Sequence, residues 1–277
     1  MSTGLTAWIG TERATPAWLD PGRAGALAAT LGCPAPEPAA LLPPLWHWLY
    51  FWDTPTPADL APDGHARRGG FLPPVDLPHR MWAGGRIWFE RPLRLGQTAT
   101  RNALVQNVVE KEGRSGPLVF VTVRAEINDA AGGRVVEEQD IVYRGPRTAP
   151  EGEPAPSLAA WARRVTPDSV MLFRYSALTF NGHRIHYDRG YATAAEGYGG
   201  LVVHGPLLAT LCLDLLRTEA AWPWPRRFTF RALRPVLDTA PFEVCGAPGD
   251  AADTANLWIR DAGGQVAMRA TANLGPV

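Results

Sequence analysis

The segment that most constrains the fold is residues 205–221, a leucine-rich stretch. Its leucines recur at three- and four-residue steps, which is the spacing of one helical face: Leu207, Leu208, Leu211, Leu215 and Leu216. Pro206 stands just inside the start, where the missing amide hydrogen costs nothing. Residues 205–216 are nearly apolar all round, so the pattern predicts a buried central helix wrapped by a sheet.

Two parts of the chain repeat one local pattern. Residues 119–128 are apolar and lead through the turn 129–133 (DAAGG) into residues 134–143, and residues 255–260 lead through 261–264 (DAGG) into residues 265–274. A strand, an Asp/Gly turn and a returning strand predict a β-hairpin in each place. Residues 86–98 (RIWFERPLRLGQT) also resemble residues 227–239 (RFTFRALRPVLDT). These parallels indicate a duplicated α+β unit.

The length and the breaks in the pattern suggest two domains. The chain has 277 residues, and Pro, Gly and charge displace apolar periodicity in residues 145–156. We therefore expect an N-terminal unit at 1–146, a linker at 147–156 and a C-terminal unit at 157–277. In the first half, residues 43–52 (PPLWHWLYFW) are the counterpart of the central helix, but they are short and Pro-rich. The Pro- and Gly-dense residues 54–74 are a candidate lid.

Composition narrows the partners. The 27 basic and 27 acidic residues balance, so no global field attracts nucleic acid or anionic lipid. No apolar run approaches the ~20 residues that span a membrane, and residues 1–12 lack a signal-peptide pattern. Cys33, Cys212 and Cys245 lack CxxC spacing, which disfavours a disulfide framework or zinc knuckle. We expect a cytoplasmic protein without nucleic-acid or membrane partners.

The chemistry-bearing residues cluster just before the leucine-rich helix. His183 and His186 are three apart, so on a helical turn they would face one side, with Asn181 nearby. A neutral imidazole is a suitable base near neutral pH. The helix starting at Gly205 offers unpaired amides at the positive end of its dipole. Adding water to an α,β-unsaturated thioester needs these two groups, a base for water and a donor for the developing enolate oxygen.

Residues 175–209 resemble the MaoC-like, R-specific enoyl-CoA hydratases. That family carries Tyr-x-x-Leu-Ser/Thr-Gly-Asp-x-Asn-Pro-x-His-x-Asp, followed by Gly-x-x-x-His-Gly. The matching positions are Tyr175, Leu178, Thr179, His186, Asp188, Gly200, His204 and Gly205. The variant FNGHRIHYD is similar to one branch, the type 2 mitochondrial 3-hydroxyacyl-thioester dehydratases and bacterial mesaconyl-C4-CoA and itaconyl-CoA hydratases. The resemblance implies an α+β double hotdog, with antiparallel sheets each wrapping a central helix. It also implies a catalytic C-terminal hotdog and a degenerate N-terminal one.

Three departures from the family pattern reshape the expected mechanism. Asn181 stands where the family has a catalytic Asp, His183 where it has Asn, and Arg184 where it has Pro. An amide cannot act as a base, so Asn181 would orient water or an imidazole. His186 then becomes the leading base, and His183 either transfers a second proton or holds the loop.

The resemblance implies further contacts around these residues. The Gly205 amide would be the oxyanion donor, and Tyr175 would contact the substrate. His204 would contact the substrate or cap the long helix. Arg184 would hold a free substrate carboxylate, grip a CoA phosphate or pair on the surface. No metal is expected, because carboxylate and thiolate ligands are sparse nearby.

The function implied is an acyl-CoA hydratase, a hydro-lyase without a separate cofactor, since coenzyme A belongs to the substrate. Itaconyl-CoA or mesaconyl-C4-CoA, hydrated to citramalyl-CoA, are the leading substrates. The alternatives are a 3-hydroxyacyl-thioester dehydratase of fatty-acid synthesis, a hotdog acyl-CoA thioesterase and a non-catalytic acyl-CoA-binding protein. Hotdog units often pair through their sheets, so a homodimer is one expected arrangement.

Overall fold

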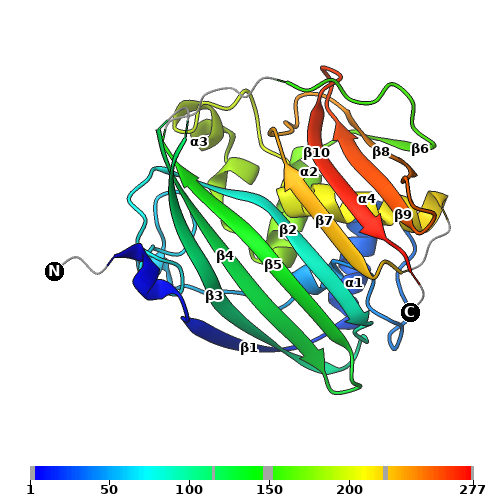
Figure 1. Cartoon of the computed structure of the whole chain (residues 1–277), viewed down its shortest axis with the longest axis horizontal. Helices are drawn as coiled ribbons and strands as arrows, with labels where there is room; N and C mark the ends of the chain where they lie inside the picture. The colour runs from blue at the N-terminus through cyan, green and yellow to red at the C-terminus, as the bar shows by residue number, and fades with distance from the viewer. Residues whose placement is uncertain (1–3, 114–115, 146–151, 221–223, 276–277) are drawn as a thin grey trace.

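A curled antiparallel sheet forms the front of the molecule in Figure 1, a computed structural model that describes residues 4–113, 116–145, 152–220 and 224–275. Among these residues ten strands form one sheet, in the order β1-β3-β4-β5-β2-β7-β10-β9-β8-β6. The strands of the first half are β1 Glu12–Trp18, β2 His79–Arg91, β3 Thr98–Gly113, β4 Gly116–Asp129 and β5 Arg134–Arg144. Those of the second half are β6 Trp161–Val165, β7 Arg227–Ala232, β8 Phe242–Pro248, β9 Thr254–Arg260 and β10 Val266–Asn273.

The helices lie behind the sheet in this view. The α-helices are α1 Pro21–Leu31, α2 Ser169–Thr179, α3 Arg189–Ala194 and α4 Gly205–Glu219. Four short 3-10 helices are also present in the described part of the chain: η1 Leu5–Trp8, η2 Trp46–Leu49, η3 Pro57–Asp59 and η4 Arg184–His186. None of the helices in the described ranges is long and apolar enough to cross a membrane.

The strand order repeats about the centre of the sheet. Outward from the central β2–β7 pair, one half runs β5, β4, β3, β1 and the other runs β10, β9, β8, β6. The two halves therefore correspond strand by strand, which confirms the duplicated α+β unit and places both predicted hairpins at β4–β5 and β9–β10. The two resembling stretches, in β2 and β7, pair antiparallel from Gly84↔Arg231 to Trp88↔Arg227 and join the halves.

The buried central helix is confirmed as α4. Every residue from Leu207 to Leu216 is buried, and the helix packs on β6, β8, β9 and β10. Ala221, the last residue of the predicted segment, lies outside the described residues. The strands of the second half thus curl around an apolar helix, and the chain has the double-hotdog α+β fold.

The first half has a much shorter helix in the corresponding place. Between β1 and β2 the apolar residues 43–52 form only η2. The helix before it, α1, was not predicted. Its start is capped by the Asp20 carboxylate, which accepts a hydrogen bond from the Gly22 amide, and it ends at Gly32 with φ +70°. The first half therefore has a single short turn, η2, where the second half has α4.

The loop predicted as a candidate lid is fastened to the sheet. Phe71 and Leu72 pack with Val75 in a second apolar cluster formed with β3, β4 and β5. Arg68 donates hydrogen bonds to the carbonyls of Val75 and Leu77, both at 2.5 Å. The loop is therefore a packed part of the molecule on the side where β2 begins.

Residues 146–151 of the predicted linker lie outside the described residues. The division into 1–146, 147–156 and 157–277 therefore stays a prediction. The described end of the linker follows the second half of the sheet, where Pro154 forms a bridge to Gln265.

Candidate active site

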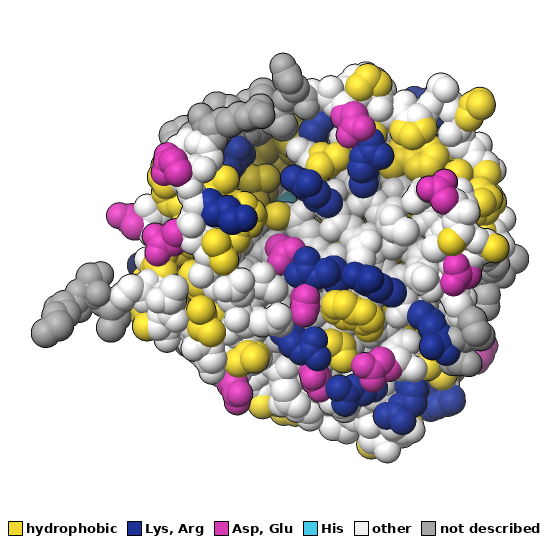
Figure 2. All heavy atoms as spheres, in the orientation of Figure 1, with side chains coloured by type: hydrophobic (Ala, Val, Ile, Leu, Met, Phe, Trp, Pro, Cys, Tyr) yellow, Lys and Arg dark blue, Asp and Glu magenta, His cyan; other side chains and the backbone are white. Residues whose placement is uncertain are grey.

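A cavity of about 820 Å³ lies between the two halves and takes its walls from both. The predicted residues Tyr175, Asn181, His183, His186 and Gly205 all line it. Five arginines also line it, Arg80, Arg101 and Arg144 from the first half and Arg231 and Arg234 from the second. Figure 2 shows basic side chains gathered around a hollow in the upper part of this face. The structure thus brings the predicted motif and the helix start into one chamber.

His186 is held with one ring nitrogen free. It ends η4, and its Nδ1 lies 2.7 Å from the carbonyl oxygen of Val202. A carbonyl only accepts, so Nδ1 carries the hydrogen and Nε2 keeps its lone pair. Burial lowers the pKa of His186 to about 4, so the ring is neutral at pH 7. This is the tautomer and charge state of a general base.

His204 supports His186 from behind. The two rings stack with centroids 3.7 Å apart, and His204 Nε2 lies 2.8 Å from the Ser176 hydroxyl. His204 is fully buried and is not among the residues that line the cavity. Its side chain makes no capping hydrogen bond to α4. His204 is the N-cap residue of α4, as predicted, but only through its backbone carbonyl, which accepts from the Leu208 amide; its ring packs behind His186 instead of reaching the cavity.

Tyr175 packs at the same place. Its ring centroid lies 4.9 Å from that of His204, and burial raises the pKa of its hydroxyl. The hydroxyl therefore stays protonated, and Tyr175 forms part of the wall rather than an acid–base group.

Asn181 and His183 fix the loop that follows α2. Asn181 Oδ1 accepts a hydrogen bond of 3.0 Å from the His183 backbone N–H. The His183 ring meets the His186 ring edge-on, with centroids 5.4 Å apart. Burial, with the neighbouring His65 and His186, lowers the pKa of His183 to about 2. The motif therefore presents three neutral polar groups to the cavity.

The start of α4 faces the same cavity. Gly205 is its first residue, and its backbone N–H has no acceptor among the described residues. A Cβ on Gly205 would lie 2.7 Å from Trp82 Cε3, so the indole ring already rests on this backbone. An amide at a helix N-terminus, walled by an aromatic ring, suits a thioester oxygen that gains negative charge.

Arg184 points away from the cavity. Its guanidinium pairs with Asp188 at 2.7 Å, lies over the Tyr191 ring at 4.2 Å and donates to the Pro62 carbonyl. Asp188 also caps α3 by accepting from the Tyr191 amide. Of the three roles expected for Arg184, the structure shows pairing near the surface, with Asp188; contact with a substrate carboxylate or a CoA phosphate stays a prediction.

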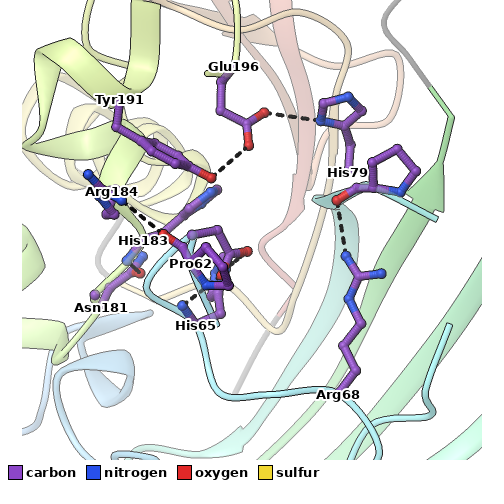
Figure 3. A network of polar contacts seen from close by, with 12 residues as sticks. Pro62, His65, Arg68, His79, Asn181, His183, Arg184, Tyr191 and Glu196 are labelled. Carbon is purple, nitrogen blue, oxygen red and sulfur yellow. Dashed lines mark hydrogen bonds and ion pairs between the residues drawn. The ribbon is translucent and has the colours of Figure 1, made fainter. Parts of the chain in front are cut away.

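Sequence reasoning missed a carboxylate–imidazole pair on the packed loop. His65 lines the cavity, and its Nδ1 lies 2.9 Å from Asp63 Oδ2. Its ring centroid is 4.1 Å from that of His183. Figure 3 shows His65, His183, Asn181 and Pro62 gathered on one side, with His79 and Glu196 apart from them. Ligand atoms of Asp63, His65 and His183 all lie within 4.8 Å of one another, and within the described part of the chain this is the group that could hold a metal ion. The Asp-Gly-His step in a polar loop was the available signal.

A buried carboxylate in the first half was also missed. Glu137 is 1% exposed and lines the cavity. It accepts hydrogen bonds from Trp48 Nε1 at 2.8 Å, His47 Nε2 at 3.2 Å and Arg101 Nε at 3.2 Å. Burial opposes its charge, but His47 and Arg101 together hold the pKa of Glu137 below its usual range. Glu137 thus ties η2 to β3 and β5.

Known proteins of the same layout carry hydratase and dehydratase names. The chain is 47% identical to mesaconyl-C(4)-CoA hydratase of Chloroflexus aurantiacus, with 99% of each chain covered. It is 30% identical to the mitochondrial hydroxyacyl-thioester dehydratase type 2 of Schizosaccharomyces pombe, over 79% of this chain and 80% of that protein. The crystal structure of a MaoC-like dehydratase from Phytophthora capsici superposes with a TM-score of 0.70, at 14% identity and 97% coverage of each chain.

The family model described as hydroxyacyl-thioester dehydratase type 2 matches residues 45–238. That range contains the loop with His65, the first half of the sheet, the motif and α4. The chain therefore belongs to the hydroxyacyl-thioester dehydratase type 2 family of double-hotdog hydro-lyases.

Proposed function

We propose that this protein is an acyl-CoA hydratase that adds water to mesaconyl-C4-CoA and gives citramalyl-CoA. One observation carries the proposal. The lone pair of His186 Nε2 and the amide of Gly205 belong to one cavity, and the ring's tautomer is fixed by Val202. The relative that is 47% identical over nearly the whole chain bears the name of this activity.

The chemistry follows from where charge develops. In mesaconyl-C4-CoA the alkene carbon next to the thioester carries hydrogen, and the other carries a methyl group and a free carboxylate. His186 Nε2 takes a proton from water while the water oxygen bonds to the carboxylate-bearing carbon. The alkene electrons move onto the thioester oxygen, which the Gly205 amide stabilises. A proton then joins the carbon next to the thioester and completes the addition.

Asn181, which stands where the broader MaoC-like pattern has Asp, suits an anionic acyl group. The attacked carbon bears the free carboxylate, so a second carboxylate at position 181 would sit beside it. Two like charges about 4 Å apart repel by about 4 kcal/mol at an effective dielectric constant of 20. Asn181 with the neutral rings of His183 and His186 avoids that repulsion.

Four of the arginines that line the cavity would bind the phosphates of coenzyme A. Arg80, Arg144, Arg231 and Arg234 line the cavity, and basic side chains surround the hollow in Figure 2. Guanidinium groups suit phosphates, and the apolar wall built by Trp48 and Trp82 suits the thioester end. In this arrangement the CoA phosphates stay outside and the acyl group reaches His186.

The 30% identity to the fission-yeast enzyme favours a second candidate, dehydration of a 3-hydroxyacyl thioester. The same residues would serve it, since it is the reverse reaction on an uncharged acyl chain. A substrate comparison separates the two.

The test follows the loss of enoyl-thioester absorbance and the release of free thiol with mesaconyl-C4-CoA, itaconyl-CoA and crotonyl-CoA. We expect loss of absorbance without free thiol, highest kcat/KM for mesaconyl-C4-CoA, and a kcat about 1,000-fold lower in H186Q. Release of thiol would identify a thioesterase instead. Higher kcat/KM for crotonyl-CoA would favour the second candidate.

A further inference from the structure

The motif offers His186 as a base and a second imidazole, His183, whose pKa is lowered to about 2 and which therefore holds a proton poorly, yet the reaction moves two protons. In the family pattern an Asp accompanies the His, and here Asn181 cannot exchange a proton. The other carboxylates that line the cavity are already committed in the described structure. Glu137 accepts from four N–H donors, on His47, Trp48, Arg101 and Gln139, and Asp53 pairs with Arg13 at 2.9 Å. Two carboxylate–imidazole pairs of the described residues stand at the cavity, Glu137–His47 and Asp63–His65, and Asp63–His65 is the one on the loop that contacts the motif.

The loop places this pair by direct backbone contact with the motif. The Arg184 amide donates to the Asp63 carbonyl at 2.9 Å. Gly64 has φ +89°, and a Cβ there would lie 1.9 Å from the Gly182 backbone oxygen. The loop and the motif therefore touch at a point where only glycine fits. With Arg68 bound to three carbonyls further along, the position of His65 is built into the fold.

The orientation of the His65 ring suits proton exchange with the cavity. Asp63 Oδ2 accepts from Nδ1, so Nδ1 carries a hydrogen and Nε2 is the exchangeable nitrogen. The side chain is 24% exposed, and it lies against the His183 ring, which in turn meets His186. Three imidazoles from two halves of the chain thus form a continuous row.

We propose that His65, held by Asp63, is the second proton-transfer residue of the reactive centre and is supplied by the N-terminal half. The inference rests on the hydratase function proposed above. In hydration, protonated His65 gives its Nε2 proton to the carbon next to the thioester, so its N–H bond breaks as the C–H bond forms. His186 Nε2 gains the proton that water loses. The proton then passes from His186 back to His65 through His183 or solvent, and one water has been added.

The charged groups around His65 set its proton affinity. Burial lowers the pKa of His65, as do Arg80 on β2 and Arg68 on the loop, while the Asp63 carboxylate raises it; His183 on the motif is neutral. Hydration needs His65 protonated, so kcat/KM falls as pH rises above that pKa. Removing the Asp63 charge moves this alkaline limb to lower pH.

The first test compares H65Q with H79Q. His79 is a matched control, because its Nδ1 lies 3.0 Å from Glu196, its side chain is 23% exposed and it is not among the cavity-lining residues. We expect kcat to fall about 100-fold in H65Q and to stay within about twofold in H79Q. Equal kcat in the two variants would overturn the proposal.

The second test measures kcat/KM from pH 5 to 9 in D63N, with D59N as the control. Asp59 lies on the same loop; its side chain is exposed and accepts a hydrogen bond from the Thr56 hydroxyl. We expect the alkaline limb to move to lower pH in D63N alone, a shift that a purely structural role would not produce. If the alkaline decline of kcat/KM falls at the same pH in the wild type and in D63N, the role of Asp63 is refuted.

A third test separates proton transfer from metal binding. It measures turnover of each enoyl-CoA on which the wild type is active. Imidazole should restore turnover to H65A, and a chelator should leave the wild type unchanged. Loss of wild-type turnover to the chelator, with recovery on adding Zn²⁺, would overturn the proposal in favour of a metal at Asp63, His65 and His183. A wild type silent on every enoyl-CoA would refute the hydratase function itself, whereas an active wild type with a fully active H65Q refutes only this inference.

Discussion

Gly205→Ala tests whether the start of α4 is the oxyanion donor. The backbone angle φ of Gly205 is not positive, so alanine is conformationally acceptable there. The added Cβ would lie 2.7 Å from Trp82 Cε3 and 3.1 Å from Cζ3, whereas carbon atoms in contact are normally about 3.5–4.0 Å apart. The indole or the helix start must therefore move by about 1 Å.

The indole is not free to take up that movement. Trp82 stacks on Phe230 with centroids 4.4 Å apart, meets Trp48 edge-on and donates from Nε1 to Gln139 at 3.3 Å. Part of the shift should therefore fall on the Gly205 amide. A displacement of 1 Å in a catalytic group costs about 100-fold in rate, and overpacking costs about 1–3 kcal/mol of stability.

The assay pairs the hydration kcat with urea unfolding for the wild type, G205A, W82L and the double variant. We expect a kcat about 100-fold lower in G205A and a lower free energy of unfolding. The stability loss should largely disappear in the W82L background, where no ring meets the new methyl group. Unchanged kcat in G205A would refute the oxyanion assignment, and an equal stability loss in both backgrounds would refute the clash.

Three further results are expected. The pKa of His186 is about 4 in the folded protein and about 6.5 in the unfolded chain, so the free energy of unfolding should fall as pH drops from 6.5 toward 4, by about 3 kcal/mol from this ring. Urea unfolding at pH 7 and 4.5 measures this change. H186Q should make the free energy of unfolding less dependent on pH. R184M should reduce kcat/KM equally for mesaconyl-C4-CoA and crotonyl-CoA, since Arg184 holds the loop; a loss confined to the dicarboxylyl substrate would restore a carboxylate-binding role. E137Q should lower the free energy of unfolding by about 3 kcal/mol, because Arg101 and His47 lose their charged partner inside the protein; a change below about 0.5 kcal/mol would contradict it.

Elements with strong local patterns were predictable from sequence. The leucine spacing of residues 205–216 and the Asp/Gly turns of the two hairpins identified α4, β4–β5 and β9–β10, and with them the duplicated fold. The helix α1 (PGRAGALAATL) was missed because its small residues give little apolar periodicity. Its local signals were the capping Asp20 before Pro21 and Gly32 after its last turn, and in the structure it packs against α2 and η2.

The candidate site was predictable only where it is local in sequence. Asn181, His183, His186 and Gly205 lie within 25 residues, and the structure gathers all four at the cavity. His65 joins them through contacts between residues 62–65 and 182–184, which are far apart along the chain. The Arg184–Asp188 pair has i,i+4 spacing and is local, whereas the contacts of Arg184 with Pro62 and of His204 with Ser176 join residues that are far apart along the chain.

The single seam between β2 and β7 has a consequence for how such an enzyme can change. Two identical subunits related by a twofold axis would carry every substitution in both of their pockets at once. A single chain removes that constraint, and here the second half holds the long helix α4 and the proposed base His186, while the first half has only η2 in the corresponding place. Substitutions in the first half can therefore reshape the wall of the cavity while the residue proposed to activate water stays unaltered.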